Sequence, residues 1–409
     1  METKEAMMQS SLTWVDLTEA DQRRAREIIR SLGPQETRDE LGLGTLRDAI
    51  ANLFFPGTTT LQTRARYFLF TPWLYTKYET LPIQSLDVQR RLWKDEVRLI
   101  KVLKEGLQDG VIGERAGQNL QRFPSSIYWN GVRTWGILRL NISQSGYHRS
   151  WDQIKAWLRT QSATDDHDPV EGRWRTAWDM GLPRAPAGFP GGVIFDLRQE
   201  EAEYLRERAL LSCGSSLWPT LLIGCKSSEV DFVWLHPELS SFPQDQQACI
   251  TQAQNLSDVL LGAAWLYNLM LSELQEADDW VRSYQVGLLR WRDSLSERWR
   301  ELVQWDRDGF WTWMHGVAQI PSRTRQFAES WMGLVLAGRS PPDVASSAYA
   351  RDLIQAREGW LKGARSRFSS PQHLAQYKGE AGTRPLDYRW RVARRIANDI
   401  LRGLDSGRE

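Results

Sequence analysis

The longest regular hydrophobic pattern in the chain follows Glu276. Large apolar residues recur there at spacings of three and four, which places them on one face of an α-helix, namely Tyr284, Leu288, Trp291, Leu295, Trp299, Leu302 and Trp305. The pattern predicts a helix of roughly 30 residues. Such a stripe is typical of a surface that faces a protein core, and its length also fits packing against a second chain.

Helix-start signals dominate the N-terminal part of the sequence. Thr18, Thr37 and Thr45 each precede an acidic residue by three positions, as helix N-caps often do, so we expect three short helices within the first 55 residues. The spacing from Glu40 to Ile50 is similar to the turn and second helix of a DNA-binding helix-turn-helix. Asp48, however, stands where that motif buries an aliphatic side chain, which favours an ordinary helical hairpin.

The stretch QTRARYFLFTPW, residues 62–73, combines two arginines with an apolar run. Thr59 and Gln62 have the spacing of a capping box, which predicts that Arg64 and Arg66 lie in the first two turns of a buried helix that kinks or ends at Pro72. Arginines beside a buried helix usually pair with carboxylates. Asp39, Glu40 and Asp48 are the nearest candidates, and contact of the arginines with an anion or a nucleic acid is the alternative.

Residues 163–192 are rich in proline, glycine and acidic residues, which is typical of a long loop or a linker. We therefore expect an N-terminal helical domain over residues 1–159, a linker over 160–195 and a tryptophan-rich helical domain over 196–409. His167 stands among three aspartates, a combination that favours a solvated acidic loop over a cation site because no second ligand cluster matches it. A capped helix is expected from Asp196, and the runs TLLIGC and VDFVWL fit strands or buried helical turns.

Composition narrows the class of protein. The chain has 409 residues, 21 of them tryptophan, and 41% are hydrophobic, which together with the helical patterns predicts a mainly α fold with at most a few short strands. The net charge of +1 provides no global attraction for nucleic acid or an anionic membrane. The three cysteines, the lack of a recognisable signal peptide and the lack of a long apolar run indicate a cytoplasmic protein without a membrane partner.

Positive charge is concentrated near the C-terminus. Between Arg357 and Arg395 there are ten basic residues against three acidic ones, a local charge of +7, with aromatic residues interleaved. This combination can bind nucleic acid, since arginines hold phosphates and aromatic rings stack on bases. The candidate residues are Arg365, Arg367, Arg389, Trp390, Arg391, Arg394 and Arg395. An acidic protein partner and a solvated basic face are the alternatives.

The tripeptide RWR occurs four times, beginning at residues 173, 290, 298 and 389. Either the ring stacks on a base between two phosphate-binding arginines, or a buried ring is bracketed by arginines that reach water. The hydrophobic stripe favours the second interpretation for the two copies after Glu276.

Motifs of catalysis are missing from the sequence. There is no phosphate-binding loop, dinucleotide fingerprint, HExxH, paired CxxC or nucleophile elbow. Cys225 and His236 could pair, but structural roles are favoured for both. We expect no cofactor and no metal, and we assign no catalytic residue.

Three segments carry a resemblance to a known family. They are residues 37–75, TRDELGLGTLRDAIANLFFPGTTTLQTRARYFLFTPWLY; the runs WLHPELSSFP and GAAWLYNLML within 234–271; and PLDYRWRVARRIANDILRGL near the C-terminus. The chain closely resembles an uncharacterised bacterial family defined by a domain of unknown function. The resemblance implies a genomic context in defence islands, beside helicase-like and phospholipase-D-like genes, and it transfers no catalytic residue. Family members are expected to carry a histidine and an arginine before the GAAWLYNLML run, and this chain has neither in residues 252–261.

The sequence thus favours a non-catalytic nucleic-acid-associated or scaffolding subunit of a prokaryotic antiviral defence system. Helicase-like and nuclease-like proteins are the expected partners, with DNA or RNA as a further ligand. The alternative is an unrecognised enzyme, most plausibly a metal-dependent nuclease.

Overall fold

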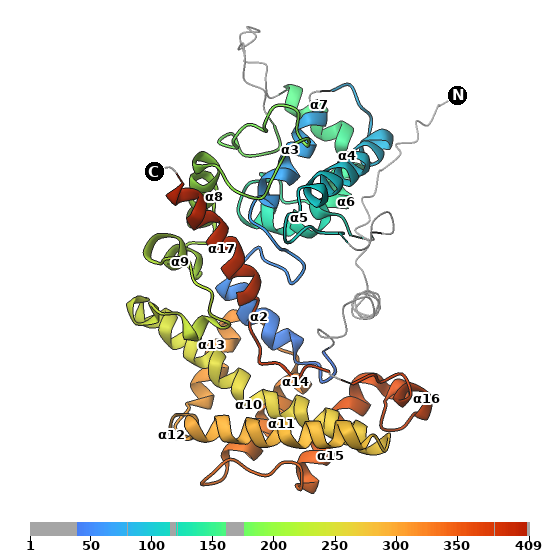
Figure 1. Ribbon diagram of the computed structural model, residues 1–409, viewed down its shortest axis with the longest axis vertical. Coiled ribbons are helices and arrows are strands. Elements are labelled where there is room, and N and C mark those ends of the chain that lie inside the picture. Colours follow the sequence, from blue (N-terminus) through green and yellow to red (C-terminus); the bar gives the residue numbers. More distant parts are fainter. Residues whose placement is uncertain are drawn as a thin grey trace, which may run out of the picture. The chain divides into compact units, whose positions relative to one another are not determined.

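The computed structural model describes residues 39–79, 81–114, 120, 122–160, 176–379 and 381–406 (Figure 1). These residues form α-helices and short 3-10 helices and contain no strand, only an isolated antiparallel bridge between Leu138 and Trp178. The predicted mainly α fold is confirmed. None of the described helices combines the length and the apolar character that crossing a membrane would require.

The chain divides into two compact units, and each unit is built from separate stretches of sequence. Unit 1 comprises residues 1–43, 259–303 and 322–385, and unit 2 comprises residues 44–258, 304–321 and 386–409. The first part of the longest helix, α10, belongs to unit 2 and the rest to unit 1.

Unit 2 contains most of the helices. They are α2 (Gly44–Phe54), α3 (Tyr67–Glu79), α4 (Ser85–Glu105), α5 (Pro124–Thr134), α6 (Gln144–Arg149), α7 (Trp151–Thr160), α8 (Gln199–Ser212), α9 (Trp218–Gly224), η3 (Val233–Leu235), η4 (Leu239–Ser241), the start of α10 (Gln244–Leu274), α13 (Arg307–Val317) and α17 (Trp390–Asp405). Unit 1 contains the remainder of α10 with α11 (Asp278–Glu297), α12 (Trp299–Val303), α14 (Ser322–Leu336), α15 (Ala348–Lys362), η5 (Gly363–Arg365) and α16 (Pro371–Leu374).

The N-terminal helix predictions are partly confirmed. The helix expected from Thr45 is α2, and the helix expected from Asp196 is α8. The helix expected from Thr18 lies outside the described residues. The described part of the helix expected from Thr37 is not helical, because residues 40–42 form a turn that leads into α2. A first helix before this turn would lie outside the described residues, so the helical hairpin stays a prediction.

The prediction that Arg64 and Arg66 begin a helix is also wrong. Gln62 does accept a hydrogen bond from the Thr59 backbone N–H at 3.3 Å, but this contact closes a turn, and α3 begins only at Tyr67. The capping signal was therefore a turn signal, since the same side chain-to-backbone bond serves both structures. The buried helix itself is confirmed, with every residue from Tyr67 to Tyr75 buried, and α3 continues through Pro72 to its end at Glu79.

The sequence predicted a helix of roughly 30 residues after Glu276, but the observed helix, α11, has 20 residues. Helix α11 ends at Glu297, Arg298 departs from helical geometry, and the short α12 follows. Most of the hydrophobic stripe is buried, but Trp305 belongs to unit 2, where its indole N–H donates to Gln252. In the RWR copy on α11, Trp291 is buried and Arg290 is exposed, as the second interpretation predicted.

The expected linker over residues 160–195 does not separate the two units, because both of its flanks belong to unit 2. Its described part runs against the segment after α5: Arg139 N–H donates to Ala177 O, and Asp179 N–H donates to Ile137 O, at 2.9 and 2.8 Å. Trp178 is buried between these bonds. The proline- and glycine-rich composition reflects an irregular packed loop. His167 and the first RWR copy lie outside the described residues.

The runs TLLIGC and VDFVWL form helical turns. Helix α9 ends within the first run, and η3 occupies the end of the second. The segment between them, residues 225–232, is hydrogen-bonded to Trp390 and Asn398 of α17.

A chain of aromatic contacts holds α17 in unit 2. Phe68 stacks on Trp135 at 4.3 Å, Trp135 meets Trp218 edge-on, and Trp218 leads through Phe55 to Trp390 at the start of α17. Aromatic pairs of this kind add about 0.5–1.5 kcal/mol each beyond their buried area. Further along α17, Gly403 lies so close to α8 that a Cβ atom would come within 2.8 Å of Ala202, so the two helices pack at short range (Figure 1).

Candidate anion-binding pocket

Helix α17 presents two chemically distinct faces. Trp390, Ala393, Ile396 and Ile400 face the core of unit 2. A row of polar residues recurs at helical spacings on the other side, namely Arg391, Arg394, Arg395, Asn398 and Arg402. Because the apolar residues fix the rotation of the helix, the arginines necessarily share one surface.

This surface lines a polar pocket of about 450 Å³. Three loops complete its walls, carrying Arg64, Asp109 and Glu229. With Asp399, the lining holds five arginines and three carboxylates, a formal charge of +2. The pocket lies entirely within unit 2.

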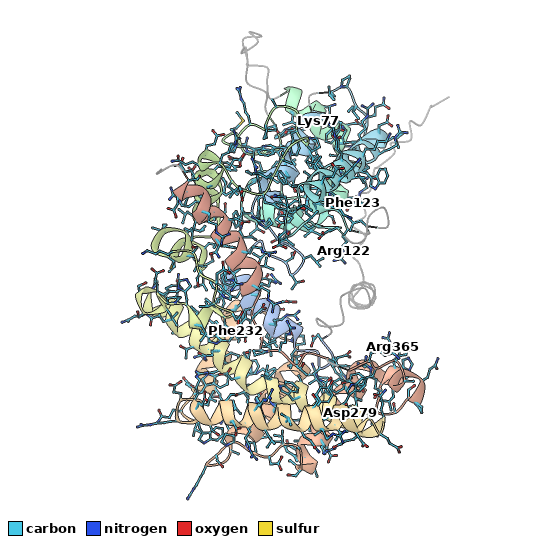
Figure 2. The ribbon with its side chains drawn as sticks, viewed as in Figure 1. Lys77, Arg122, Phe123, Phe232, Asp279 and Arg365 are labelled. Atoms are coloured by element: carbon cyan, nitrogen blue, oxygen red, sulfur yellow. The ribbon has the colours of Figure 1, made fainter. Side chains whose placement is uncertain are left out.

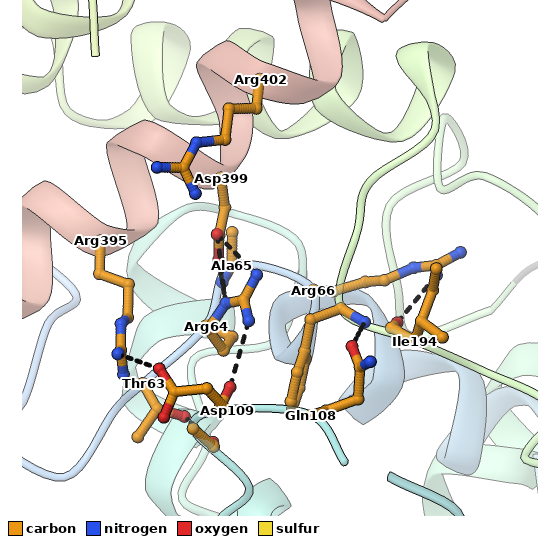
Figure 3. A network of polar contacts seen from close by, with 12 residues as sticks. Thr63, Arg64, Ala65, Arg66, Gln108, Asp109, Ile194, Arg395, Asp399 and Arg402 are labelled. Atoms are coloured by element: carbon orange, nitrogen blue, oxygen red, sulfur yellow. Dashed lines mark hydrogen bonds and ion pairs between the residues drawn. The ribbon is translucent and has the colours of Figure 1, made fainter. Parts of the chain in front are cut away.

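Arg64 is held firmly at the base of the pocket (Figure 3). Its Nε and Nη2 donate to the two carboxylate oxygens of Asp399 at 2.9 and 3.0 Å, and Nη1 donates to the backbone oxygen of Asp109 at 3.1 Å. The Asp399 side chain is 4% exposed and also accepts from the Ala65 backbone N–H. This bidentate pair joins the loop before α3 to α17 and leaves little freedom to either side chain.

Arg391, Arg395 and Arg402 are held more loosely than Arg64. Arg395 pairs with Asp109, and Arg402 pairs with Glu229 at 3.3 Å, and the two carboxylates are 81% and 70% exposed. Exposed pairs of this kind contribute only about 0–1 kcal/mol. Arg391 is exposed and forms no ion pair with a described residue. An incoming anion could therefore take the place of Asp109 and Glu229 at little cost.

Glu229 lines the pocket and pairs with Arg394 at 3.6 Å. Arg394 Nη1 donates to the Val230 backbone oxygen at 2.6 Å. Asn398 exchanges two hydrogen bonds with the backbone of Ser228, at 3.1 and 2.8 Å, and is itself buried. The loop is thus bound to α17 through a buried amide.

The structure distributes the predicted nucleic-acid-binding residues over different settings. Arg391, Arg394 and Arg395 line the pocket together with Arg64, which sequence reasoning had assigned separately to an anion contact or an ion pair. Arg64 and Arg66 do form ion pairs, but with Asp399 and Glu201 and not with the nearby carboxylates that the sequence suggested. Those partners are remote in sequence, so proximity along the chain was a poor guide.

Trp390 and Arg389 serve the fold instead. Trp390 is 1% exposed and donates its indole N–H to Val230 O at 2.9 Å, so its face is not accessible for stacking on a base. Arg389 donates to Asn52 and Thr58 and pairs with Asp48 at 3.3 Å. Burial lowers the pKa of Arg389 from its usual value. The interpretation of the C-terminal RWR as a stacking platform is therefore wrong.

Arg365 and Arg367 belong to unit 1. Arg367 is largely buried, where it pairs with Glu40 at 3.0 Å and donates to the Tyr267 hydroxyl. Arg365 is exposed on η5, at the position labelled in Figure 2. Arg357, counted among the basic residues of the C-terminal segment, is buried and donates to the backbone oxygen of Leu41 at 2.8 Å. The local charge of +7 overstated the exposed positive surface, because several of its arginines point inward.

Sequence reasoning missed Arg402, Asn398 and Asp109. Arg402 could have been found, since it follows Arg395 by seven residues and therefore lies on the same face of a helix. Asp109 and Glu229 have no comparable signal, because tertiary packing alone brings their loops to α17.

These features define a mainly α-helical protein with an arginine-lined pocket in one of its two units. The chain matches a family of unknown function, DUF6361, over residues 9–403, and it belongs to that family. No curated protein and no solved structure matches it.

Proposed function

We propose that the pocket on α17 binds phosphate groups of a nucleic acid and that the protein acts as a nucleic-acid-associated subunit in the cytoplasm. The observation that carries the proposal is the convergence of five arginines from two remote parts of the sequence around one cavity. Within the described residues, Arg395 and Arg402 form ion pairs with exposed carboxylates, and Arg391 is exposed. Guanidinium groups suit phosphate because their fork of N–H donors matches its oxygens.

The pocket supports backbone contact better than sequence-specific recognition. Its described lining contains no aromatic side chain on which a base could stack. Phosphate contacts position a protein on nucleic acid without reading bases. The proposed binding is accordingly sensitive to salt and tolerant of sequence.

The experiment measures binding of labelled single- and double-stranded DNA and RNA by fluorescence anisotropy over a range of salt concentrations. The test variant replaces Arg391, Arg395 and Arg402 by alanine. The matched control replaces the exposed Arg300, Arg307 and Arg339, which removes the same charge away from the pocket.

We expect the pocket variant to lose affinity and to flatten the dependence on salt, by about 0.9 in the slope of log K against log salt for each duplex phosphate that the variant no longer neutralises. The control variant should behave like the wild type. Equal losses of affinity in both variants would show that only the net charge of the protein matters, and would refute the proposal that this pocket binds nucleic acid.

A role in prokaryotic antiviral defence, beside helicase-like and nuclease-like partners, is a separate proposal that rests on the family resemblance. Affinity purification of the tagged protein from its host tests it. Stoichiometric recovery of such a partner would support a scaffolding subunit, and recovery of the protein alone would count against one.

A further inference from the structure

The loop that forms one wall of the pocket begins and ends at residues with metal-binding side chains. Cys225 follows α9, while His236 and Glu238 follow η3. One ligand atom from each, a sulfur, a ring nitrogen and a carboxylate oxygen, lie within 4.8 Å of one another. Eleven positions of sequence separate the cysteine from the histidine, so the fold brings the three together.

The three donors suit zinc. Zn²⁺ binds thiolate, imidazole and carboxylate at about 2.0–2.3 Å, so neighbouring ligand atoms in a tetrahedral site lie roughly 3.3–3.8 Å apart. The three ligand atoms already lie within 4.8 Å of one another, so small side-chain rotations suffice to bring them to these separations. A water molecule or another donor would complete four-fold coordination.

The imidazole is in a form that can bind a cation. His236 Nδ1 accepts a hydrogen bond from the Glu238 backbone N–H at 3.2 Å, so this nitrogen carries a lone pair and no proton. Burial lowers the pKa of His236, which keeps the ring neutral at neutral pH. Zinc bound at Nδ1 would replace one long hydrogen bond.

Without a cation, burial and the Glu238 carboxylate disfavour the thiolate form of Cys225. Burial, together with the nearby Glu238 carboxylate, raises the pKa of Cys225 to about 12, so the thiol is protonated at neutral pH. A dication between the two groups would stabilise both negative charges. On binding, the Zn–S bond forms, the S–H bond breaks, and the proton goes to solvent.

The geometry points to a zinc site formed by Cys225, His236 and Glu238, in which the ion ties together the two ends of loop 225–238. The loop holds Ser228 against Asn398, and Val230 accepts from both Trp390 and Arg394. The ion is therefore structural: it fixes the wall of the arginine pocket by closing the loop at its base. Zinc binding does not depend on whether that pocket binds nucleic acid.

The test measures metal content first. Full-length protein is incubated with Zn²⁺ alone, dialysed, and assayed by inductively coupled plasma mass spectrometry. We expect an equimolar amount of zinc in the wild type, little in Cys225→Ser and His236→Ala, and an equimolar amount in Cys213→Ser, which changes another buried cysteine of unit 2. A wild type that retains no zinc, or a Cys225→Ser variant that retains as much as the wild type, would overturn the proposal.

Cobalt gives a second measurement, which does not depend on the variants folding well. Co²⁺ added to the wild type should produce a thiolate-to-metal charge-transfer band. Because binding releases one proton from the thiol, the affinity of the protein for Co²⁺ should rise about tenfold for each unit by which the pH is increased, as long as the pH stays below the pKa of the thiol. Absence of the band in folded wild-type protein would show that the cysteine is not a ligand and would also overturn the proposal.

Discussion

Arg64 and Asp399 form a bidentate ion pair between positions that lie 335 residues apart in the sequence. The pair joins the loop before α3 to the polar face of α17, and it sets the base of the candidate pocket. Asp399 is nearly inaccessible to solvent, so water cannot replace the Arg64 guanidinium in stabilising its negative charge.

Replacing Asp399 by alanine should destabilise the protein. The change leaves the Arg64 guanidinium and the Ala65 N–H without their acceptor, which costs about 3 kcal/mol for a largely buried pair. Urea denaturation followed by tryptophan fluorescence measures the shift in the unfolding transition. Asp279→Ala is the control, because Asp279 is 93% exposed (Figure 2) and its removal should not shift the transition measurably. An unchanged transition in the Asp399 variant would contradict the structural role of this pair.

Glu96 should make stability fall as pH rises. Burial raises the pKa of Glu96 to about 7, and its side chain accepts from the Ser125 backbone N–H at 2.8 Å. Between the usual carboxyl pKa of 4.5 and about 7, the folded state keeps a proton that the unfolded state releases. Stability therefore decreases from about pH 4.5 to pH 7, by about 3 kcal/mol from this group.

The measurement is the free energy of unfolding at several pH values for the wild type and Glu96→Gln, whose amide oxygen can still accept from Ser125. The variant should become the more stable of the two as pH rises. Burial also raises the pKa of Glu79, so a smaller decline should remain in the variant. Parallel pH profiles for the two proteins would show that Glu96 titrates normally.

Two glycines in unit 1 should not tolerate alanine. A Cβ atom on Gly262 of α10 would lie 2.3 Å from the ring of Trp291 on α11. In the same way, a Cβ atom on Gly287 of α11 would lie 2.4 Å from the ring of Trp265 on α10. Each helix thus packs a tryptophan against a glycine of the other helix. Although alanine favours a helix over glycine by about 1 kcal/mol, we expect Gly262→Ala to destabilise the protein by about 1–3 kcal/mol, because the ring must move.

The helical Gly359 provides the matched control, since a Cβ atom there meets nothing within 4 Å. Gly359→Ala should raise the melting temperature, while Gly262→Ala should lower it. If both substitutions stabilise the protein, the tryptophan-on-glycine packing is wrong.

A substitution at Trp390 distinguishes a role in stacking on bases from a role in the stability of the fold. Trp390→Phe keeps an aromatic ring but removes the hydrogen bond to Val230, so we expect a loss of stability of about 1 kcal/mol and unchanged affinity for single-stranded nucleic acid. Anisotropy assays well below the unfolding temperature measure the affinity. If the variant is as stable as the wild type but loses affinity for single-stranded nucleic acid, the Trp390 ring does stack on a base.

The sequence determined the class of fold through local rules. A continuous apolar run predicted the buried helix α3, and periodic apolar residues predicted the stripe along α11. The arginines of α17 can be placed on one face because the spacing of a helix is fixed by the backbone. Local hydrogen-bonding signals were less decisive. Thr59 and Gln62 make the expected contact, yet they close a turn, because such a contact fits a turn as well as a helix start.

Tertiary structure alone decided which charges meet. Nothing near Arg64 or Arg66 in the sequence indicates Asp399 or Glu201, and nothing in the C-terminal basic segment distinguishes the buried Arg357 from the exposed Arg391. An ion pair depends on the approach of two side chains in space, and residues far apart in the chain approach only after the apolar faces of their helices have packed. The pocket, and the cluster of Cys225, His236 and Glu238 beside it, exist for that reason only in the folded protein.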